Sequence, residues 1–182
     1  MAARVDVLNN GYVGDRVAST VTLIRDGDAV VVVDPGMVAS RGAILDPLTV
    51  LGVPVDDVTD VVFSHHHPDH TLNAALFPNA RFHDFWAIYQ DDLWDDRDAD
   101  GFQVSPAVRL MTTPGHTAED ISTFAETDNG LIVLTHLWWH ADGPEVDPYA
   151  KDLDLLRANR ERVLAERPAL LIPGHGAPFV PR

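Results

Sequence analysis

Apolar residues gather in short runs along the first third of the chain, and these runs predict β-strands. The clearest run is 29–33, Ala-Val-Val-Val-Val, which is followed by the turn residues Asp34-Pro35-Gly36. A strand without alternating polar residues is typical of a sheet that is buried on both faces. Weaker runs of the same kind predict strands at 5–8, 17–24 and 58–64. We therefore expect a sheet with further layers on both sides.

The rest of the pattern predicts helices and further strands. Apolar residues at helical spacing favour helices over 40–51, with Ser40 as the N-terminal cap, and over 151–167. Pro68 predicts the first turn of a short helix, where proline is tolerated. The segment 84–101 has no clear period and is expected to be a long loop or lid with a helical piece. Further strands are expected at 108–112, 121–125, 131–135 and 170–172.

Composition and charge narrow the classes of function. The chain has 182 residues, of which 46% are apolar, and we expect a single globular α/β domain over 1–182. Its formal net charge of −15 repels polyanions, so nucleic-acid partners are not expected. The absence of cysteine leaves imidazole and carboxylate as metal ligands. We see no signal peptide and no membrane span, and we expect a cytoplasmic protein.

Potential metal ligands are most concentrated in the hexapeptide 65–70, His-His-His-Pro-Asp-His, directly after the strand predicted at 58–64. His65 and His67 are two residues apart at a strand end, so their side chains should point to the same face. Asp69 and His70 follow where the chain bends into a helix, within reach of a second metal ion. Paired ions about 3.5–4 Å apart can share a hydroxide. The alternative is a polar surface loop.

The hexapeptide resembles the H-x-H-x-D-H signature of the metallo-β-lactamase superfamily. Asp34-Pro35-Gly36 is similar to that family's first aspartate-containing strand end, and two further segments are similar to its later histidine loops: Thr113-Pro114-Gly115-His116-Thr117 and Pro173-Gly174-His175-Gly176. The stretches TPGHTAEDIS and IPGHGAPF resemble the group around metallo-β-lactamase-domain-containing protein one. The resemblance spans nearly the whole chain. It implies a four-layer αββα sandwich of two mixed sheets flanked by helices.

The resemblance also implies a role for each matching residue. One metal ion would be bound by His65, His67 and His116. A second would be bound by Asp69, His70 and His175. Asp69 would also be catalytic, orienting a hydroxide, and Asp34 would orient a metal-bound imidazole, although an aspartate before proline is an ordinary turn residue too. The implied cofactors are two divalent ions, zinc in the first place, with iron or manganese as alternatives.

The chain departs from the family pattern at one position. The family normally has an aspartate after a buried strand, where it bridges the two metal ions, but here the strand at 131–134 leads into Thr135-His136. His136 either binds a metal ion, or lines a site with one tight and one weak ion, or marks a domain that has lost catalysis. A neutral imidazole in place of the aspartate leaves one more positive charge, which favours an anionic small-molecule substrate.

The remaining histidines and aromatic residues are weaker candidates. His66 is expected to pack or to support a ligand, and His83 to lie at the surface. His140 either lies away from the site or reaches its mouth. The aromatic residues of 85–94 and 138–139 would either wall a pocket or fill the core or a homodimer interface.

The function that these features predict is metal-dependent hydrolysis. A metal-activated hydroxide would attack a small ester, thioester, lactone or phosphodiester. Two alternatives belong to other classes: iron-dependent oxidation of persulfides, and metal binding without catalysis. Metal analysis together with a hydrolysis panel would separate the three.

Overall fold

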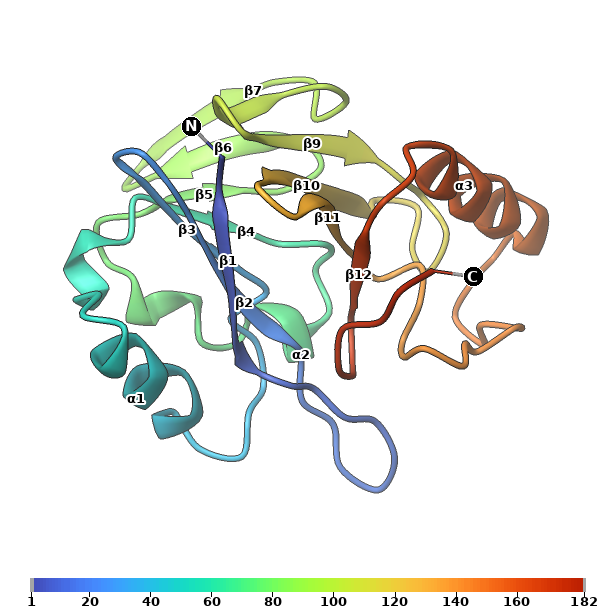
Figure 1. The fold of residues 1–182 in the computed structure, drawn as a ribbon, viewed down its shortest axis with the longest axis horizontal. Helices are drawn as coiled ribbons and strands as arrows, with labels where there is room; N and C mark the ends of the chain where they lie inside the picture. The colour runs from blue at the N-terminus through green and yellow to red at the C-terminus, as the bar shows by residue number, and fades with distance from the viewer. Residues whose placement is uncertain (1, 182) are drawn as a thin grey trace.

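The computed structural model describes residues 2–181, which form two β-sheets packed face to face with helices on the outside (Figure 1). The first sheet contains β1 (Arg4–Asn9), β2 (Val21–Asp26), β3 (Ala29–Val33), β4 (Asp60–Val62), β5 (Arg81–His83), β6 (Ala87–Gln90) and β7 (Leu93–Asp96). The second contains β8 (Gln103–Ser105), β9 (Val108–Thr112), β10 (Ile121–Thr127), β11 (Gly130–Thr135) and β12 (Leu170–Pro173). The α-helices are α1 (Gly42–Val50), α2 (Pro68–Thr71) and α3 (Leu153–Ala165).

Both sheets are mixed. The first follows chain order from β1 to β7, and the second has the order β12-β11-β10-β9-β8. The pairs β3–β4, β4–β5 and β11–β12 are parallel, and the other pairs are antiparallel. Helix α1 packs on the outer face of the first sheet and α3 on the outer face of the second. The expected αββα sandwich is confirmed.

Strand β3 shows why an uninterrupted apolar run suits this architecture. Val31 and Val33 point into the core between the two sheets, whereas Val32 points outwards and packs with Ile44 and Leu48 of α1. All three valines are almost fully buried. Burying one such side chain contributes about 1.5–3 kcal/mol, so each face of the strand stabilises a different layer contact.

The segment 84–101 differs from the sequence prediction. It forms a β-hairpin of β6 and β7 in place of a loop with a helical piece, and the prediction was wrong there. Tyr89 and Trp94 face each other across the hairpin, with ring centroids 4.6 Å apart, and Asp91 takes up the positive φ of 52° that the turn needs. Every residue of β7 is exposed, so the apolar alternation that marks a half-buried strand is missing.

Element boundaries also shift by a few residues. Helix α1 begins at Gly42, with Arg41 in place of Ser40 at the N-terminal cap position. The helix at Pro68 ends after one turn and resumes as a 3-10 helix, Ala74–Leu76. The strands expected at 17–24 and 58–64 are observed as the shorter strands β2 and β4.

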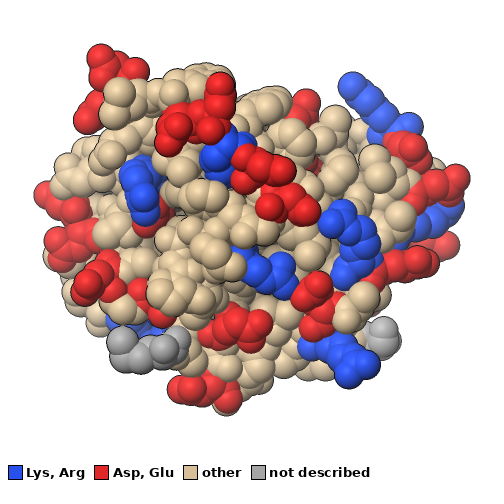
Figure 2. Space-filling model, turned by 90° about the horizontal axis from the view of Figure 1, so that it is seen from above, with Lys and Arg blue, Asp and Glu red and all other residues tan. Residues whose placement is uncertain are grey.

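Acidic and basic side chains are interspersed on the face shown in Figure 2. On the face in Figure 2, the Lys and Arg side chains lie scattered among acidic ones and form no continuous patch. That no nucleic acid is bound stays a prediction. Within residues 2–181, no helix is both long and apolar enough to cross a membrane.

Candidate metal centre

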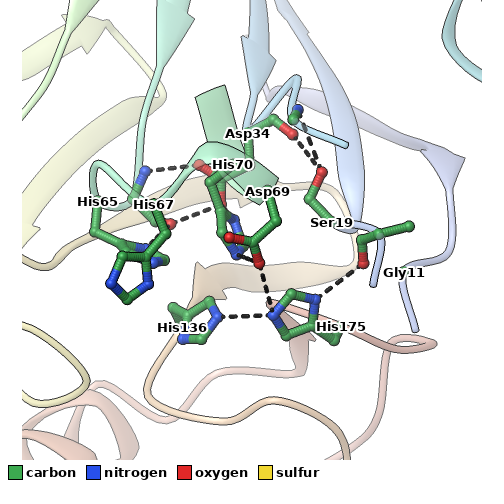
Figure 3. Close-up of polar contacts among 12 residues, drawn as sticks. Gly11, Ser19, Asp34, His65, His67, Asp69, His70, His136 and His175 are labelled. Carbon is green, nitrogen blue, oxygen red and sulfur yellow. Dashed lines mark hydrogen bonds and ion pairs between the residues drawn. The ribbon is translucent and has the colours of Figure 1, made fainter. Parts of the chain in front are cut away.

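The polar site residues follow the carboxyl ends of strands that meet at one edge of the sandwich. Strands β3 and β4 are parallel, and β9, β11 and β12 run in one direction in the other sheet. Asp34 follows β3, the hexapeptide 65–70 follows β4, His116 follows β9, His136 follows β11 and His175 follows β12. This topology brings distant parts of the chain together around one space (Figure 3).

Five buried histidines form two clusters that share one member. In each cluster, one ligand atom from each of three residues lies within 4.8 Å of the others. The first cluster is His65, His116 and His136, and the second is His70, His136 and His175. The ring of His136 lies between them, with centroid distances of 4.1 Å to His116 and 4.6 Å to His70. The histidine that replaces the expected aspartate therefore occupies the shared position.

His67 and Asp69 lie at the open side of these clusters. The Nδ1 atom of His67 is 3.1 Å from Nε2 of His116. The Oδ2 atom of Asp69 lies 3.4 Å from Nε2 of both His70 and His175. All seven side chains expected from the sequence as ligands are thus brought together, and their role as metal ligands stays a prediction.

Asp34 positions two of the imidazoles. Its carboxylate accepts hydrogen bonds from the backbone N and the Oγ of Ser64, each at 2.7 Å, and from Nδ1 of His70 at 2.9 Å. Ser64 Oγ is also 3.1 Å from His65 Nδ1, and it accepts that bond because its own hydrogen goes to Asp34. Asp34 has a φ of 52°, rare for a non-glycine residue. Both imidazoles therefore direct their Nε2 atoms towards the site.

Asp147 positions a third imidazole and was not identified from the sequence. Its buried Oδ2 accepts hydrogen bonds from Nδ1 of His116 at 2.8 Å and from Nε1 of Trp139 at 2.9 Å. Its Oδ1 accepts the backbone N–H of Tyr149 at 2.9 Å. Asp147 lies in an irregular segment before α3 with no motif around it, so only the fold shows its partners.

The free nitrogen atoms fit a metal-binding role. Among the described residues, Nε2 of His65, Nε2 of His70 and Nδ1 of His136 are buried without a hydrogen-bond partner. An unpaired buried polar group costs about 1–3 kcal/mol, so these atoms are expected to meet a ligand. His175 donates from Nδ1 to the carbonyl of Ala18 at 2.9 Å, and its Nε2 lies 3.1 Å from Nε2 of His136. Imidazole nitrogens with one carboxylate suit zinc or iron.

Electrostatics also favour neutral imidazoles at His65, His136 and His175, but not at His70. Burial and neighbouring imidazoles hold the pKa values of His65 and His136 well below 6.5, and burial lowers the pKa of His175 to about 4. Burial opposes ionisation of Asp69, but the neighbouring imidazole of His70, whose Nε2 lies 3.4 Å from Oδ2, lowers the pKa of Asp69 to about 2. Burial would likewise lower the pKa of His70, but two neighbouring carboxylates raise it to about 9. A proton on His70 must therefore leave before a metal ion binds.

Two glycines of the motifs make room for this packing. A Cβ atom on Gly36 would collide with the backbone carbonyl of Asp69, so the loop after β3 can lie directly against α2 only with glycine there. A Cβ atom on Gly174 would lie 2.7 Å from Nε2 of His136. Both glycines are therefore explained by close approach.

The other three histidines lie outside the clusters. His66 is about half exposed, and its Nε2 is 2.8 Å from Oδ2 of Asp84. The expectation that His83 lies at the surface was wrong: it is fully buried, and its Nε2 is 2.8 Å from Oδ1 of Asp60. A buried polar partner on the neighbouring strand explains this position. His140 forms an isolated backbone bridge and does not line the cavities described next.

Two adjoining cavities open over the clusters. The site cleft has a volume of about 380 Å³ and is lined by Val13, Gly14, Val17, His67, Pro68, Asp69, His116, Trp139, Tyr149 and His175. The side pocket, also about 380 Å³, shares His67, His116 and Tyr149 with it and adds Gly115, Thr117, Ala118, Glu119, Lys151, Asp152 and Leu155. Of the aromatic candidates, Trp139 lines the site cleft, whereas Trp138 packs against Phe179.

A four-layer αββα sandwich with histidines and aspartates at one edge of both sheets defines a protein of the metallo-β-lactamase type. Residues 14–89 match the family model of the metallo-beta-lactamase superfamily. Metallo-beta-lactamase domain-containing protein 1 of Xenopus laevis is 32% identical, over 96% of this chain and 80% of that protein. The mouse protein of the same name is 33% identical over 82% of this chain, which spans 60% of its length. The chain therefore belongs to the metallo-β-lactamase superfamily.

Solved structures agree on the fold. A Thermotoga maritima protein assigned to the metallo-β-lactamases superposes with a TM-score of 0.78 at 22% identity, and all of both chains is covered. A dizinc quorum-quenching lactonase in complex with a product superposes with a TM-score of 0.65 at 19% identity, over 86% of this chain and 72% of that one. At these identities the likeness concerns the fold.

Proposed function

We propose that this protein is a metal-dependent hydrolase acting on a small ester, thioester, lactone or phosphodiester. The observation that carries the proposal is the convergence of six imidazoles and one carboxylate on an open cleft, with buried nitrogen atoms that have no partner in the described chain. Lactonases among the structural neighbours favour the ester and lactone members of this set.

The donor set supports two divalent ions, zinc in the first place. One would be held by His65, His67 and His116. The other would be held by Asp69, His70 and His175. His136 lies within reach of both groups, and we assign it as a ligand in place of the usual aspartate. When bound, such ions lower the pKa of water and polarise a carbonyl or phosphoryl oxygen.

The protein itself would position the reactants. The side chain of Asp69 is 18% exposed, faces the cleft and is ionised at neutral pH because its pKa is about 2. Its Oδ2 can therefore accept a hydrogen bond from water and orient it for attack. Trp139 and Tyr149 present aromatic rings to the same cleft, where they would hold a planar or apolar group and exclude bulk water.

Elemental analysis of the purified protein, combined with a hydrolysis panel, tests the proposal. We expect up to two divalent ions per chain and turnover of a 4-nitrophenyl ester or a homoserine lactone, in preference to a thioester or bis(4-nitrophenyl) phosphate. His116→Ala should lose both metal and turnover. His140→Ala removes a histidine outside the clusters and should retain both.

Two outcomes would overturn the proposal in favour of its alternatives. Bound metal without turnover on the whole panel would indicate a non-catalytic binding domain. Iron as the native metal, together with oxygen-dependent consumption of a persulfide, would indicate oxidation.

A further inference from the structure

The chain contains a single lysine, Lys151, and this residue lines the side pocket next to the metal centre. Its side chain is exposed. The ion pairs within residues 2–181 are formed by Arg and His, and none involves Lys151. In a protein with a net charge of −15, an unpaired cation beside the candidate site is a candidate binding group for an anion.

The side pocket is continuous with the site cleft. Both cavities are lined by His67, His116 and Tyr149. The Tyr149 ring lies 5.8 Å from the ring of His67 and 5.4 Å from that of His116, so it stands where the two cavities meet. A molecule whose reacting bond lies at these histidines can therefore extend one arm towards Lys151 and the other into the site cleft.

The two cavities that the arms would enter differ in the residues that line them. The lining of the site cleft includes Val13 and Val17, which do not line the side pocket. The side pocket contains Lys151 together with two acidic residues, Glu119 and Asp152. The carboxylate of Asp152 is already engaged, because it caps the N-terminus of α3 by accepting two backbone N–H groups. One cation with two acids nearby favours a monoanion over a dianion, so a carboxylate fits better than a phosphate.

We propose that Lys151 binds a carboxylate of the substrate and thereby sets the specificity of the enzyme. The preferred substrates are then small esters or lactones that carry one carboxylate on one side of the reacting carbonyl group and a short apolar group on the other. This inference rests on the proposed hydrolase function and names its substrate class.

A matched pair of esters tests the inference by kinetics. The mono-4-nitrophenyl ester of glutarate and 4-nitrophenyl pentanoate differ only in a terminal carboxylate or methyl group. In Lys151→Met, kcat/KM for the glutarate ester should fall roughly three- to tenfold, mainly through KM, while that for the pentanoate ester stays unchanged. Lys151→Arg keeps the charge and should keep the preference.

Arg157→Met is the matched control. It removes a positive charge from the same end of α3, but Arg157 pairs with Asp154 at 3.0 Å and does not line the side pocket. We expect no change in the preference for the glutarate ester. If Lys151→Met slowed both esters equally, or neither, the inference would be wrong.

A binding experiment separates this inference from the proposed function. Because there is one lysine, reductive methylation with carbon-13 formaldehyde gives one dimethyl-lysine NMR signal beside that of the N-terminal amine. Pentanoate should shift the lysine signal saturably, phosphate should shift it less, and pentanamide should leave it unchanged. Equal effects of pentanoate and pentanamide would overturn the inference even if esters are hydrolysed. A pentanoate-specific shift without turnover of any ester would refute the hydrolase and leave the anion site standing.

Discussion

Asp147→Asn replaces the carboxylate that holds His116, and the structure allows its cost to be worked out. The carboxylate accepts hydrogen bonds from His116 and Trp139 on Oδ2 and from the backbone of Tyr149 on Oδ1, at 2.8–2.9 Å. Asparagine has one oxygen, so in either orientation at least one donor faces the amide NH₂. Leaving such a donor unpaired costs about 1–3 kcal/mol of unfolding free energy.

The same substitution should weaken metal binding. If the amide NH₂ turns towards His116, the imidazole can accept that bond only by moving its own proton to Nε2. This proton would then occupy the nitrogen that faces the candidate metal site. Loss of a residue that orients a metal-binding imidazole typically lowers metal affinity about 10–100-fold.

Two measurements check these effects separately. Competition with a chromophoric chelator gives the metal affinity, and urea unfolding of the metal-free protein gives the stability. Asp154→Asn is the matched control, because that carboxylate is exposed and its ion pair with Arg157 is worth about 0.2–1 kcal/mol at most. If Asp147→Asn lost stability but bound metal as tightly as the wild type, Asp147 would support the loop and not His116, and the reasoning would be refuted.

Three further predictions follow from individual contacts. Gly174→Ala puts a Cβ atom 2.7 Å from Nε2 of His136, so the ring must move. We expect a lower metal content with an unchanged circular dichroism spectrum. Full metal content would contradict the packing argument. His136→Asp supplies a carboxylate at the shared position. We expect altered metal content and a weaker preference for anionic over neutral esters. If both stayed as in the wild type, the charge argument would be wrong. Burial lowers the pKa of His83 below 6.5, and despite burial the hydrogen bond from His83 lowers that of Asp60 below 3.8. The folded state therefore binds fewer protons than the unfolded state, so the unfolding free energy falls as the pH drops below about 6.5. His83→Gln should reduce the stability lost between about pH 7.5 and 5.5 in urea unfolding, and an identical loss in both proteins would exclude His83 as its source.

The sequence is sufficient to predict those site residues that follow the ends of neighbouring strands. The run 29–33 predicts β3 with its observed bounds, because a strand buried on both faces needs apolar residues throughout. The hexapeptide 65–70 and the later site histidines each follow a predicted strand, and the carboxyl ends of these strands meet at one edge. Two glycines in the same motifs mark backbone that packs directly on site residues.

Residues whose role depends on partners far away in the sequence are not marked by any local motif. Asp147 lies 31 residues from His116, and an aspartate before proline reads as a turn residue until the fold places it under the imidazole. His83 is buried because Asp60 faces it from the next strand, which the local sequence does not reveal. Lys151 becomes notable only once the fold puts it beside the cleft. In each case the physical cause is a long-range contact.

The placement of His136 limits how the two clusters can share it. A carboxylate offers one oxygen to each of two ions, but a neutral imidazole has a lone pair on only one nitrogen. Nε2 of His136 lies 3.1 Å from Nε2 of His175, and its Nδ1 is buried with no partner among the described residues. Gly174 packs against the ring and holds it there. Two metal ions would therefore compete for this one ligand, and zinc titration should give two binding constants of clearly different size; two equal sites would mean that His136 serves neither ion or has lost both protons.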